Sequence, residues 1–169
     1  MSNEANLIQE LAYRQEIADL VARLGLMLDE HRFEEAPSIL APDVTVQTPG
    51  GSSRGLEGVI AQARRNHTVR TQHVATNLLI DVEGERARVR ANLIVTFAPD
   101  PDQPGSLLLI GGTTTPTFTL GERYRMEAAR GEEGWRLTAI EVTRVWSSQP
   151  VPPGARIEQI EANATTAAA

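Results

Sequence analysis

Apolar residues recur at helical spacing along the N-terminal segment of the chain. They stand three, four or six positions apart with polar residues between them, which predicts an amphipathic helix over residues 4–29 whose apolar stripe covers a sheet. Gly25 lies inside this helix and disfavours it by about 1 kcal/mol relative to alanine. We therefore expect a close approach of backbone, side chain or ligand at Gly25. The stripe consists of Leu7, Leu11, Ile17, Val21, Leu24 and Leu28.

Two more helices and a short strand are predicted before the pattern changes. A short helix over 33–40 leads into a strand over 44–48, and the cluster Pro49-Gly50-Gly51-Ser52-Ser53 predicts a turn. A third helix follows over 55–67. Its inward face is predicted to hold Leu56, Val59, Ile60 and Ala63.

From residue 71 onward the hydrophobic pattern has period two, which is typical of strands. Alternation is clearest over 86–98, where one face is predicted to be core or cavity and the other solvated. The first strand is unusual because His73 and Asn77 share a face with Ala75 and Leu79, and together they offer a proton acceptor and an orienting hydrogen-bond group. The predicted strands span 71–82, 86–98, 107–129 and 135–147.

These elements indicate one α+β domain over residues 1–148, followed by a C-terminal arm and flexible tail over 149–169. The tail is first proline-rich and then rich in threonine and alanine. The Gly111-Gly112 pair lacks the strand-to-helix context of a phosphate-binding loop and is interpreted as a bend or bulge.

Composition excludes several kinds of chemistry. None of the 169 residues is cysteine, so disulfides, thiolate nucleophiles and cysteine-based metal sites are excluded. All 16 basic residues are arginine, which excludes Schiff-base chemistry and a phosphate-loop lysine. The three histidines have no short spacing, so we predict no metal site and no cofactor.

The formal net charge of -6 argues against nucleic acid or an anionic membrane as a partner, because both require clustered positive charge. The N-terminus shows no basic segment followed by an apolar block, and no apolar run is long enough to span a bilayer. We therefore expect a cytoplasmic location.

Asp29 changes the interpretation of His73. Alone, His73 is more simply a half-buried polar residue satisfied by a neighbour. Asp29, however, lies near the C-terminal end of the first helix, where the helix dipole disfavours a negative charge and a cationic or N–H partner is needed. We predict that an Asp29 oxygen and a ring nitrogen of His73 lie within about 3.2 Å, both in one pocket.

The pocket wall is predicted to be mostly aliphatic, too apolar for a sugar or nucleotide. Trp135 and Trp146 are assigned to the core and the pocket rim rather than to chemistry. The predicted ligand-binding residues are Val21, Leu24, Leu28, Val46, Ile60, Leu93, Val95 and Trp146.

Six features of the chain over about residues 10–147 occur together in one known family. They are Leu28-Asp29-Glu30-His31-Arg32-Phe33, Leu40-Ala41-Pro42-Asp43-Val44, Gly55-Leu56-Glu57-Gly58-Val59, Gln72-His73-Val74-Ala75-Thr76-Asn77, Tyr124 and Gly134-Trp135-Arg136-Leu137. With them the chain resembles the nuclear transport factor 2-like superfamily, in particular its SnoaL-like branch. The resemblance implies a cone-like roll in which a strongly curved, mostly antiparallel sheet and three N-terminal helices enclose a pocket, usually in a homodimer or homotrimer.

The resemblance also implies roles for individual residues. In scytalone dehydratase, bile-acid dehydratase and hexachlorocyclohexane dehydrochlorinase, an aspartate at the position of Asp29 orients a histidine at the position of His73, which removes a proton from the substrate. Leu24 stands where such dehydratases carry tyrosine and the dehydrochlorinase carries lysine, so an electrophile is missing. Tyr124 could supply an O–H donor and Asn77 an amide N–H.

Two function classes remain open. The first is a cofactor-independent lyase, isomerase or cyclase, as in SnoaL-type polyketide cyclases, that uses Asp29 and His73 on a small, largely apolar substrate of polyketide, terpenoid or steroid type. The second is a non-catalytic ligand-binding or oligomerisation module with the same pocket, which Leu24 favours.

Overall fold

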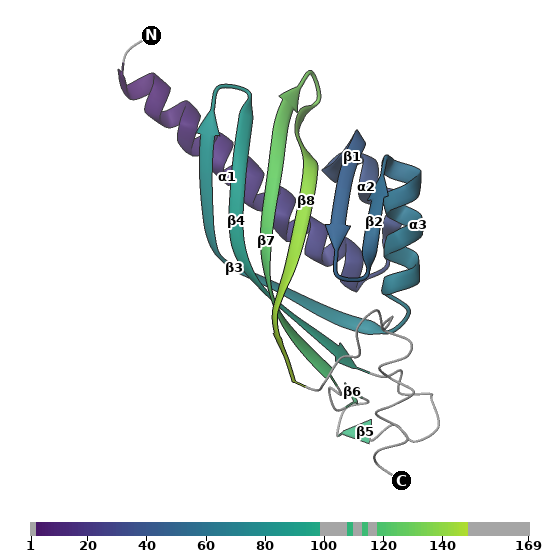
Figure 1. Ribbon diagram of the computed structural model, residues 1–169. Coiled ribbons are helices and arrows are strands. Elements are labelled where there is room, and N and C mark those ends of the chain that lie inside the picture. The colour runs from purple at the N-terminus through teal and green to yellow at the C-terminus, as the bar shows by residue number, and fades with distance from the viewer. Residues whose placement is uncertain (1–2, 99–107, 110–112, 115–117, 149–169) are drawn as a thin grey trace.

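Three helices lie against a six-stranded sheet in the computed structural model, which describes residues 3–98, 108–109, 113–114 and 118–148 (Figure 1). The expected α+β class is confirmed, and the first and third helices agree with their predicted ranges to within about a residue at each end. The predicted second helix is instead a 3₁₀ turn and a single α-helical turn. The helical elements are α1 (Asn3–Asp29), η1 (Phe33–Glu35), α2 (Ala36–Ile39) and α3 (Leu56–Asn66).

The main sheet has the strand order β2-β1-β8-β7-β4-β3. Its β1–β8 pair is parallel and its other pairs are antiparallel. A separate two-stranded antiparallel pair is formed by β5 (Leu108–Leu109) and β6 (Thr113–Thr114). The main strands are β1 (Leu40–Thr48), β2 (Gly51–Arg54), β3 (Arg70–Glu83), β4 (Arg86–Ala98), β7 (Phe118–Gly131) and β8 (Gly134–Ser147).

Some expectations about the sheet were wrong. The sheet is open and not strongly curled, since its edge strands β2 and β3 do not pair with each other. Part of the predicted 49–53 turn forms β2, which pairs back onto β1. The long strand predicted over 107–129 begins only at Phe118. The Gly111-Gly112 bend and the tail over 149–169 lie outside the described residues.

α1 runs across one face of the sheet, packs mainly on β3, and projects past the sheet at its N-terminal end (Figure 1). For this reason Leu7 and Leu11, the first residues of the predicted stripe, are each 58% exposed. No helix in the described ranges is long and apolar enough to cross a membrane. The buried face of α1 begins later and consists of Ile17, Leu20, Val21, Leu24, Met27 and Leu28.

α1 ends in a Schellman motif that fixes the direction of its last side chains. His31 has a φ of 55°, and the following residue, Arg32, donates its N–H to the carbonyl of Met27 at 3.0 Å. A second bond, at 3.4 Å, runs from the N–H of His31 to the carbonyl of Leu28. Asp29 is therefore the last helical residue, and the following segment turns away from it.

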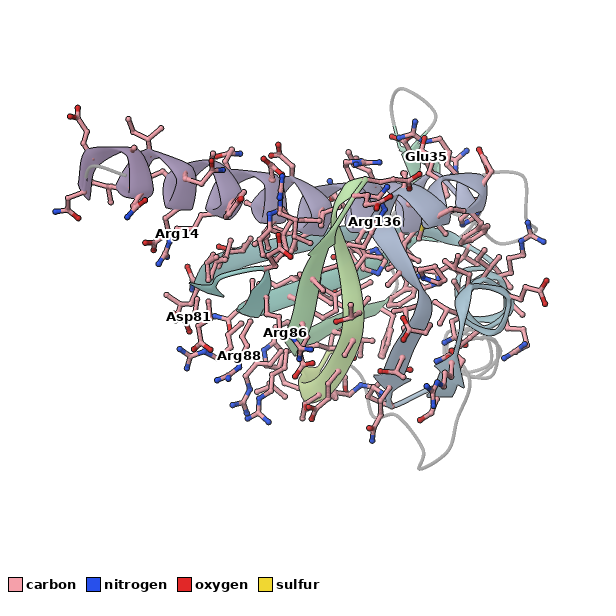
Figure 2. All side chains as sticks on the ribbon, turned by 90° about the horizontal axis from the view of Figure 1, so that it is seen from above. Arg14, Glu35, Asp81, Arg86, Arg88 and Arg136 are labelled. Carbon is pink, nitrogen blue, oxygen red and sulfur yellow. The ribbon has the colours of Figure 1, made fainter. Side chains whose placement is uncertain are left out.

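β4 shows the alternation that its sequence predicts: alanine and larger apolar side chains are buried at every second position from Ala87 to Phe97. The intervening side chains point away from the core. Figure 2 shows Arg86, Arg88 and Asp81 projecting from the β3–β4 hairpin on this side. The inner face of the sheet therefore supplies an apolar floor, while charges remain in solvent.

A β-bulge in β3 changes which residues face inward. Thr76 pairs with Asn92 and Leu79 with Arg90, so β3 contains one residue more than β4 over this stretch. Asn77 lies in the bulge with a φ of 54° and is exposed. The prediction that Asn77 and Leu79 share the face of His73 is therefore wrong, because a single extra residue reverses the alternation.

A second bulge has the same effect in β8. Arg144 pairs with Glu122 and Trp146 with Gly121, which leaves Val145 as the extra residue. Trp146 consequently lies on the outer face with Gly121 and is 49% exposed, whereas Arg144 faces inward. The assignment of Trp146 to the pocket was wrong, since an uninterrupted period of two would have placed it there.

The contact between Gly121 and Trp146 leads to a test. A Cβ atom at Gly121 would lie 2.0 Å from Cε2 of the Trp146 indole. Gly121→Ala should displace the indole, lower the free energy of unfolding by about 1 kcal/mol and shift the tryptophan emission to longer wavelength. Gly131→Ala on the same strand is the matched control, because nothing lies within 4 Å of its Cβ position. Equal effects of both substitutions in urea unfolding would contradict the packing.

Candidate functional site

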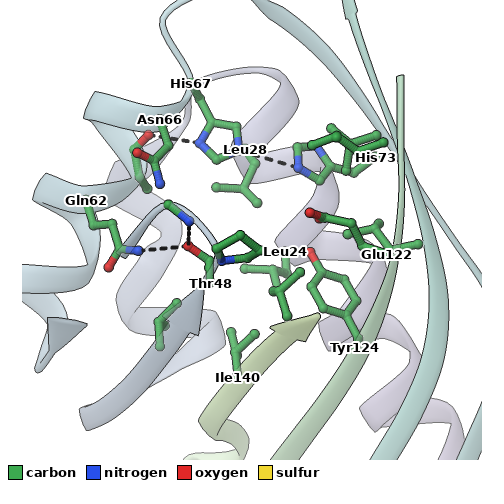
Figure 3. A pocket seen from close by; sticks show the side chains of 18 of the residues that line it. Leu24, Leu28, Thr48, Gln62, Asn66, His67, His73, Glu122, Tyr124 and Ile140 are labelled. Carbon is green, nitrogen blue, oxygen red and sulfur yellow. Dashed lines mark hydrogen bonds between the residues drawn. The ribbon is translucent and has the colours of Figure 1, made fainter. Parts of the chain in front are cut away.

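A cavity of about 140 Å³ lies between α1, α3 and the inner face of the sheet (Figure 3). Its wall is mainly aliphatic. His67, His73, Glu122 and Tyr124 form a polar side, and Thr48, Gln62 and Asn66 lie across the cavity from His73, Glu122 and Tyr124. An apolar wall with a few polar groups is the usual composition of a small-molecule site. Apolar side chains in the wall include Leu24, Leu28, Val46, Leu93, Val95 and Ile140.

Asp29 and His73 form the predicted contact. Nδ1 of His73 lies 2.5 Å from Oδ1 of Asp29, and the side chain of His73 is 6% exposed. His73 lines the cavity, whereas Asp29 lies behind it and does not belong to the wall, so the prediction that both residues lie in one pocket was wrong for Asp29. The carboxylate therefore orients the ring from behind and leaves the edge carrying Nε2 on the cavity side.

Asp29 accepts two further kinds of hydrogen bond. The Thr71 hydroxyl donates to Oδ1 at 2.9 Å, and the backbone N–H of His73 donates to Oδ2 at 2.9 Å. Burial alone would raise the pKa of Asp29, but the hydrogen bonds from His73 and Thr71 outweigh burial and hold this pKa below its ordinary value. The group behind His73 is therefore a carboxylate at neutral pH.

His67, the first residue after α3, lies beside His73 in the cavity wall. The two Nε2 atoms are 3.4 Å apart, and the ring centroids are 5.2 Å apart (Figure 3). Nδ1 of His67 lies 2.9 Å from the carbonyl oxygen of Ala63, so it donates its proton there. Burial, followed by repulsion from His73, lowers the pKa of His67 to about 4.

Glu122 and Tyr124 extend from β7 into the same polar side of the cavity (Figure 3). Burial raises the pKa of Glu122, although Arg144, whose Nε lies 3.6 Å from Oε1 of Glu122, opposes this shift. Burial also raises the pKa of Tyr124, and the nearby carboxylates of Glu122 and Asp29 add to the effect. Tyr124 is therefore a neutral hydroxyl, which makes it a donor.

Gln62 holds α3 in place over the cavity. Its side-chain N–H₂ group donates to the carbonyl of Gly51 at 3.0 Å, and its carbonyl accepts from the Ser53 hydroxyl. These bonds connect α3 to β2 through a residue that is 4% exposed. The position of His67 at the end of α3 follows from this attachment.

Residues 9–141 match the family model of the SnoaL-like domain. The chain belongs to the SnoaL-like family. No curated protein sequence matches it. The resemblance deduced from the sequence is thus confirmed.

Solved structures share the fold of this SnoaL-like chain at low identity. The protein Kfla4162 of Kribbella flavida is 19% identical, with a TM-score of 0.69 over 83% of this chain and 95% of its own. A type 2 hexachlorocyclohexane dehydrochlorinase, LinA, is 19% identical, with a TM-score of 0.68 over 88% of this chain and 99% of its own. A candidate scytalone dehydratase of Novosphingobium aromaticivorans is 17% identical, with a TM-score of 0.67 over 92% and 97%.

Not every residue predicted for the site of this SnoaL-like domain lies there. His73, Tyr124 and five of the predicted wall residues line the cavity. Asn77 and Trp146 point away because of the two bulges. Val21 is buried in the core without reaching the wall, and Ile60 packs at the margin of the core, because α3 turns Val59, Gln62, Ala63 and Asn66 toward the cavity instead.

Sequence reasoning missed six polar residues of the cavity, namely Thr48, Gln62, Asn66, His67, Glu122 and Arg144. His67 was interpreted only as a helix-end residue. Glu122 has a recognisable signal, since it is a carboxylate at an inward position between Leu120 and Tyr124. Among the residues that the structure describes, no three histidine or acidic side chains cluster in a way that could hold a metal ion.

The pKa of His67 generates a test on stability. An unfolded histidine titrates near pH 6.5, so between this value and about 4 the unfolded chain binds a proton that the folded chain does not. The free energy of unfolding should therefore fall by at most about 2 kcal/mol from pH 7 to pH 5 on account of His67. His67→Gln should lose this part of the pH dependence in urea unfolding. An unchanged pH dependence in the variant would contradict the assigned pKa.

Proposed function

We propose that this protein is a cofactor-independent acid–base enzyme, a lyase, isomerase or cyclase, acting on a small and largely apolar carbon acid. The observation that carries the proposal is the 2.5 Å hydrogen bond between Asp29 and the ring of His73 at the wall of an apolar cavity. In this arrangement the carboxylate selects the Nδ1–H tautomer and stabilises the imidazolium that forms when Nε2 takes a proton.

The chemistry requires no added group. Nε2 of His73 accepts a proton from a carbon next to a carbonyl or a leaving group, and the C–H electrons form a carbon–carbon double bond. The carbonyl oxygen then takes the negative charge, or the leaving group departs with its electron pair. In isomerisation or cyclisation the substrate recovers a proton at another atom.

Tyr124 is suited to stabilise the charge that develops on oxygen. Its hydroxyl is a neutral donor, because burial raises its pKa, and it projects toward the same part of the cavity as Glu122 (Figure 3). A donor placed in a low-dielectric cavity stabilises a developing oxyanion more than a solvated donor does.

The cavity volume limits the substrate. A cavity of about 140 Å³ is close to the engineered protein cavity of about 150 Å³ that binds benzene. This volume favours a substrate with a single ring over a steroid or a polycyclic polyketide, which would need the wall to move. The aliphatic wall supports a substrate that is mainly hydrocarbon.

The structural neighbours support an elimination as the reaction type. The names of two of them, a dehydrochlorinase and a candidate scytalone dehydratase, denote removal of a proton together with a leaving group. Leu24, which lines the cavity where the resemblance leads one to expect tyrosine or lysine, removes support for a dehydratase of the scytalone type. Leu24 also favours the second candidate, a binding module without catalysis.

Substitution of the two acid–base residues separates these candidates. With cyclohexanone as probe, His73→Ala should abolish protein-dependent exchange of deuterium from solvent into the α-carbons. Asp29→Asn should slow this exchange roughly 10²- to 10⁴-fold, because the amide cannot stabilise the imidazolium. Binding of the ketone should change much less, since buried apolar area dominates its affinity. NMR can follow both exchange and binding.

A binding module would give the opposite pattern. Exchange would then be equally slow in the wild type and in His73→Ala. Leu24→Trp, which fills the cavity, would weaken binding far more than His73→Ala does.

Tyr124→Phe tests the proposed oxyanion donor. The substitution removes one hydroxyl and keeps the ring, so exchange should slow by about 10²-fold while ketone binding and unfolding free energy change little. Tyr13→Phe is the matched control, because Tyr13 packs against Trp135 outside the cavity. Equal exchange rates in both variants would remove Tyr124 from the mechanism.

A further inference from the structure

His67 and His73 contact each other through their Nε2 atoms, and the hydrogen-bond partner of Nδ1 is known for each ring. Nδ1 of His67 faces the carbonyl oxygen of Ala63 at 2.9 Å, and a carbonyl can only accept, so this nitrogen carries a hydrogen. Nδ1 of His73 faces the ionised carboxylate of Asp29 at 2.5 Å and carries a hydrogen for the same reason. If both rings were neutral, each Nε2 would therefore be unprotonated and would carry a lone pair.

Two lone pairs facing each other at 3.4 Å repel, whereas one proton between them forms an N–H···N hydrogen bond. Water cannot resolve the repulsion, because a bridging water would require the nitrogen atoms to be about 4.5 Å apart or more. The observed separation is thus consistent with one proton between the rings.

We infer that His67 and His73 share a single proton through their Nε2 atoms and that, together with Asp29, they form a three-residue acid–base unit. This inference rests on the proposed function for its catalytic meaning. One shared proton balances the charge of the Asp29 carboxylate, so the unit is neutral overall, which suits an apolar cavity. The carboxylate of Asp29 lies against the ring of His73, whereas the ring of His67 faces a neutral carbonyl, so the proton lies mainly on His73.

The unit supplies an acid first and a base second, so Nε2 of His73 acts as the base of the proposed function once the shared proton has left it. In an elimination, the shared proton passes to the leaving oxygen, the C–O bond breaks and water departs. Both Nε2 atoms are then free, and one of them accepts the proton from carbon as the C–H electrons form the double bond. That proton restores the shared state, so one proton enters and one leaves in each turnover.

Other charged and titratable groups surround the pair and enter its titration. They come from every element packed against it: Asp29 from α1, His31 from the segment after α1, Glu122 and Tyr124 from β7, and Arg144 from β8. Any titration of the pair is therefore a property of the coupled group rather than of one ring.

Histidine NMR tests the shared proton directly on the wild-type protein. The chain has only three histidines, so selective ¹⁵N labelling gives three ring systems, which His31→Asn and His67→Phe assign. At neutral pH we expect the Nδ1–H form for His67, two protonated nitrogens for His73 and a through-bond coupling between the Nε2 atoms. Unprotonated Nδ1 in His67, or two neutral rings without coupling, would overturn the inference.

Substitution of His67 tests whether the pair acts as a unit. His67→Phe removes the acceptor of the shared proton, so the midpoint at which His73 takes up its second proton should move to lower pH by about one unit or more. The pH profile of ketone exchange should move with it. His31→Asn is the control: it should move both much less, because His31 acts on His67 through its charge alone and more weakly than His73 does, and asparagine tolerates the positive φ at this position.

The two hypotheses fail in different ways. Absence of ketone exchange in the wild type would count against the proposed function, while the NMR spectra would still decide whether the proton is shared. Exchange whose pH profile is the same in His67→Phe and wild type would overturn the three-residue unit and leave the Asp29–His73 pair intact. If His67→Phe does not fold, His67→Gln replaces it. Its amide oxygen can accept the hydrogen bond but cannot take a proton, so the wild-type coupling must disappear while the midpoint moves less.

Discussion

A carboxylate that is partly removed from water, at the end of a helix whose dipole opposes it, must find hydrogen-bond donors, and Asp29 finds them all on β3. These bonds attach the C-terminal end of α1 to β3 and fix the plane of the His73 ring. One turn earlier, a Cβ atom at Gly25 would lie 3.4 Å from Cβ of His73, the close approach expected from the sequence. The polar side of the cavity depends on this attachment, because it brings the ring of His73 within reach of His67.

The features set by regular periods could be predicted from sequence. The helix that ends at Asp29, the alternation of β4 and the approach of Asp29 to His73 all follow from repeated spacing, from the charge at a helix end and from the resemblance to a family. Each of these periods is repeated over many residues. An error of one or two residues at the end of an element therefore does not change which of its faces is buried. The open sheet was not predictable in the same way. Whether a sheet stays open depends on whether its two edge strands, here β2 and β3, pair with each other, and no local period contains this information.

Prediction failed where one residue interrupts a period. Asn77 and Trp146 were assigned to the cavity by counting positions in steps of two, and each lies at or just beyond a bulge that reverses the count. Asparagine tolerates a positive φ, which is a weak sign of a bulge, and Val145 carries no such sign. His67 was missed for another reason. The hydrogen bonds of Gln62 hold α3 in the position that brings His67 to His73, and no spacing in the sequence predicts this contact.

The bulge at Val145 separates two functions of one strand. Before it, Ile140, Val142 and Arg144 belong to the cavity wall, and after it Trp146 belongs to the outer surface. Substitutions on either side can accumulate without affecting the other face. Gain or loss of a single residue at this point, by contrast, would exchange the two faces and bring an indole into a cavity of benzene size. Among relatives, length changes here would thus alter substrate range more abruptly than any substitution in the wall.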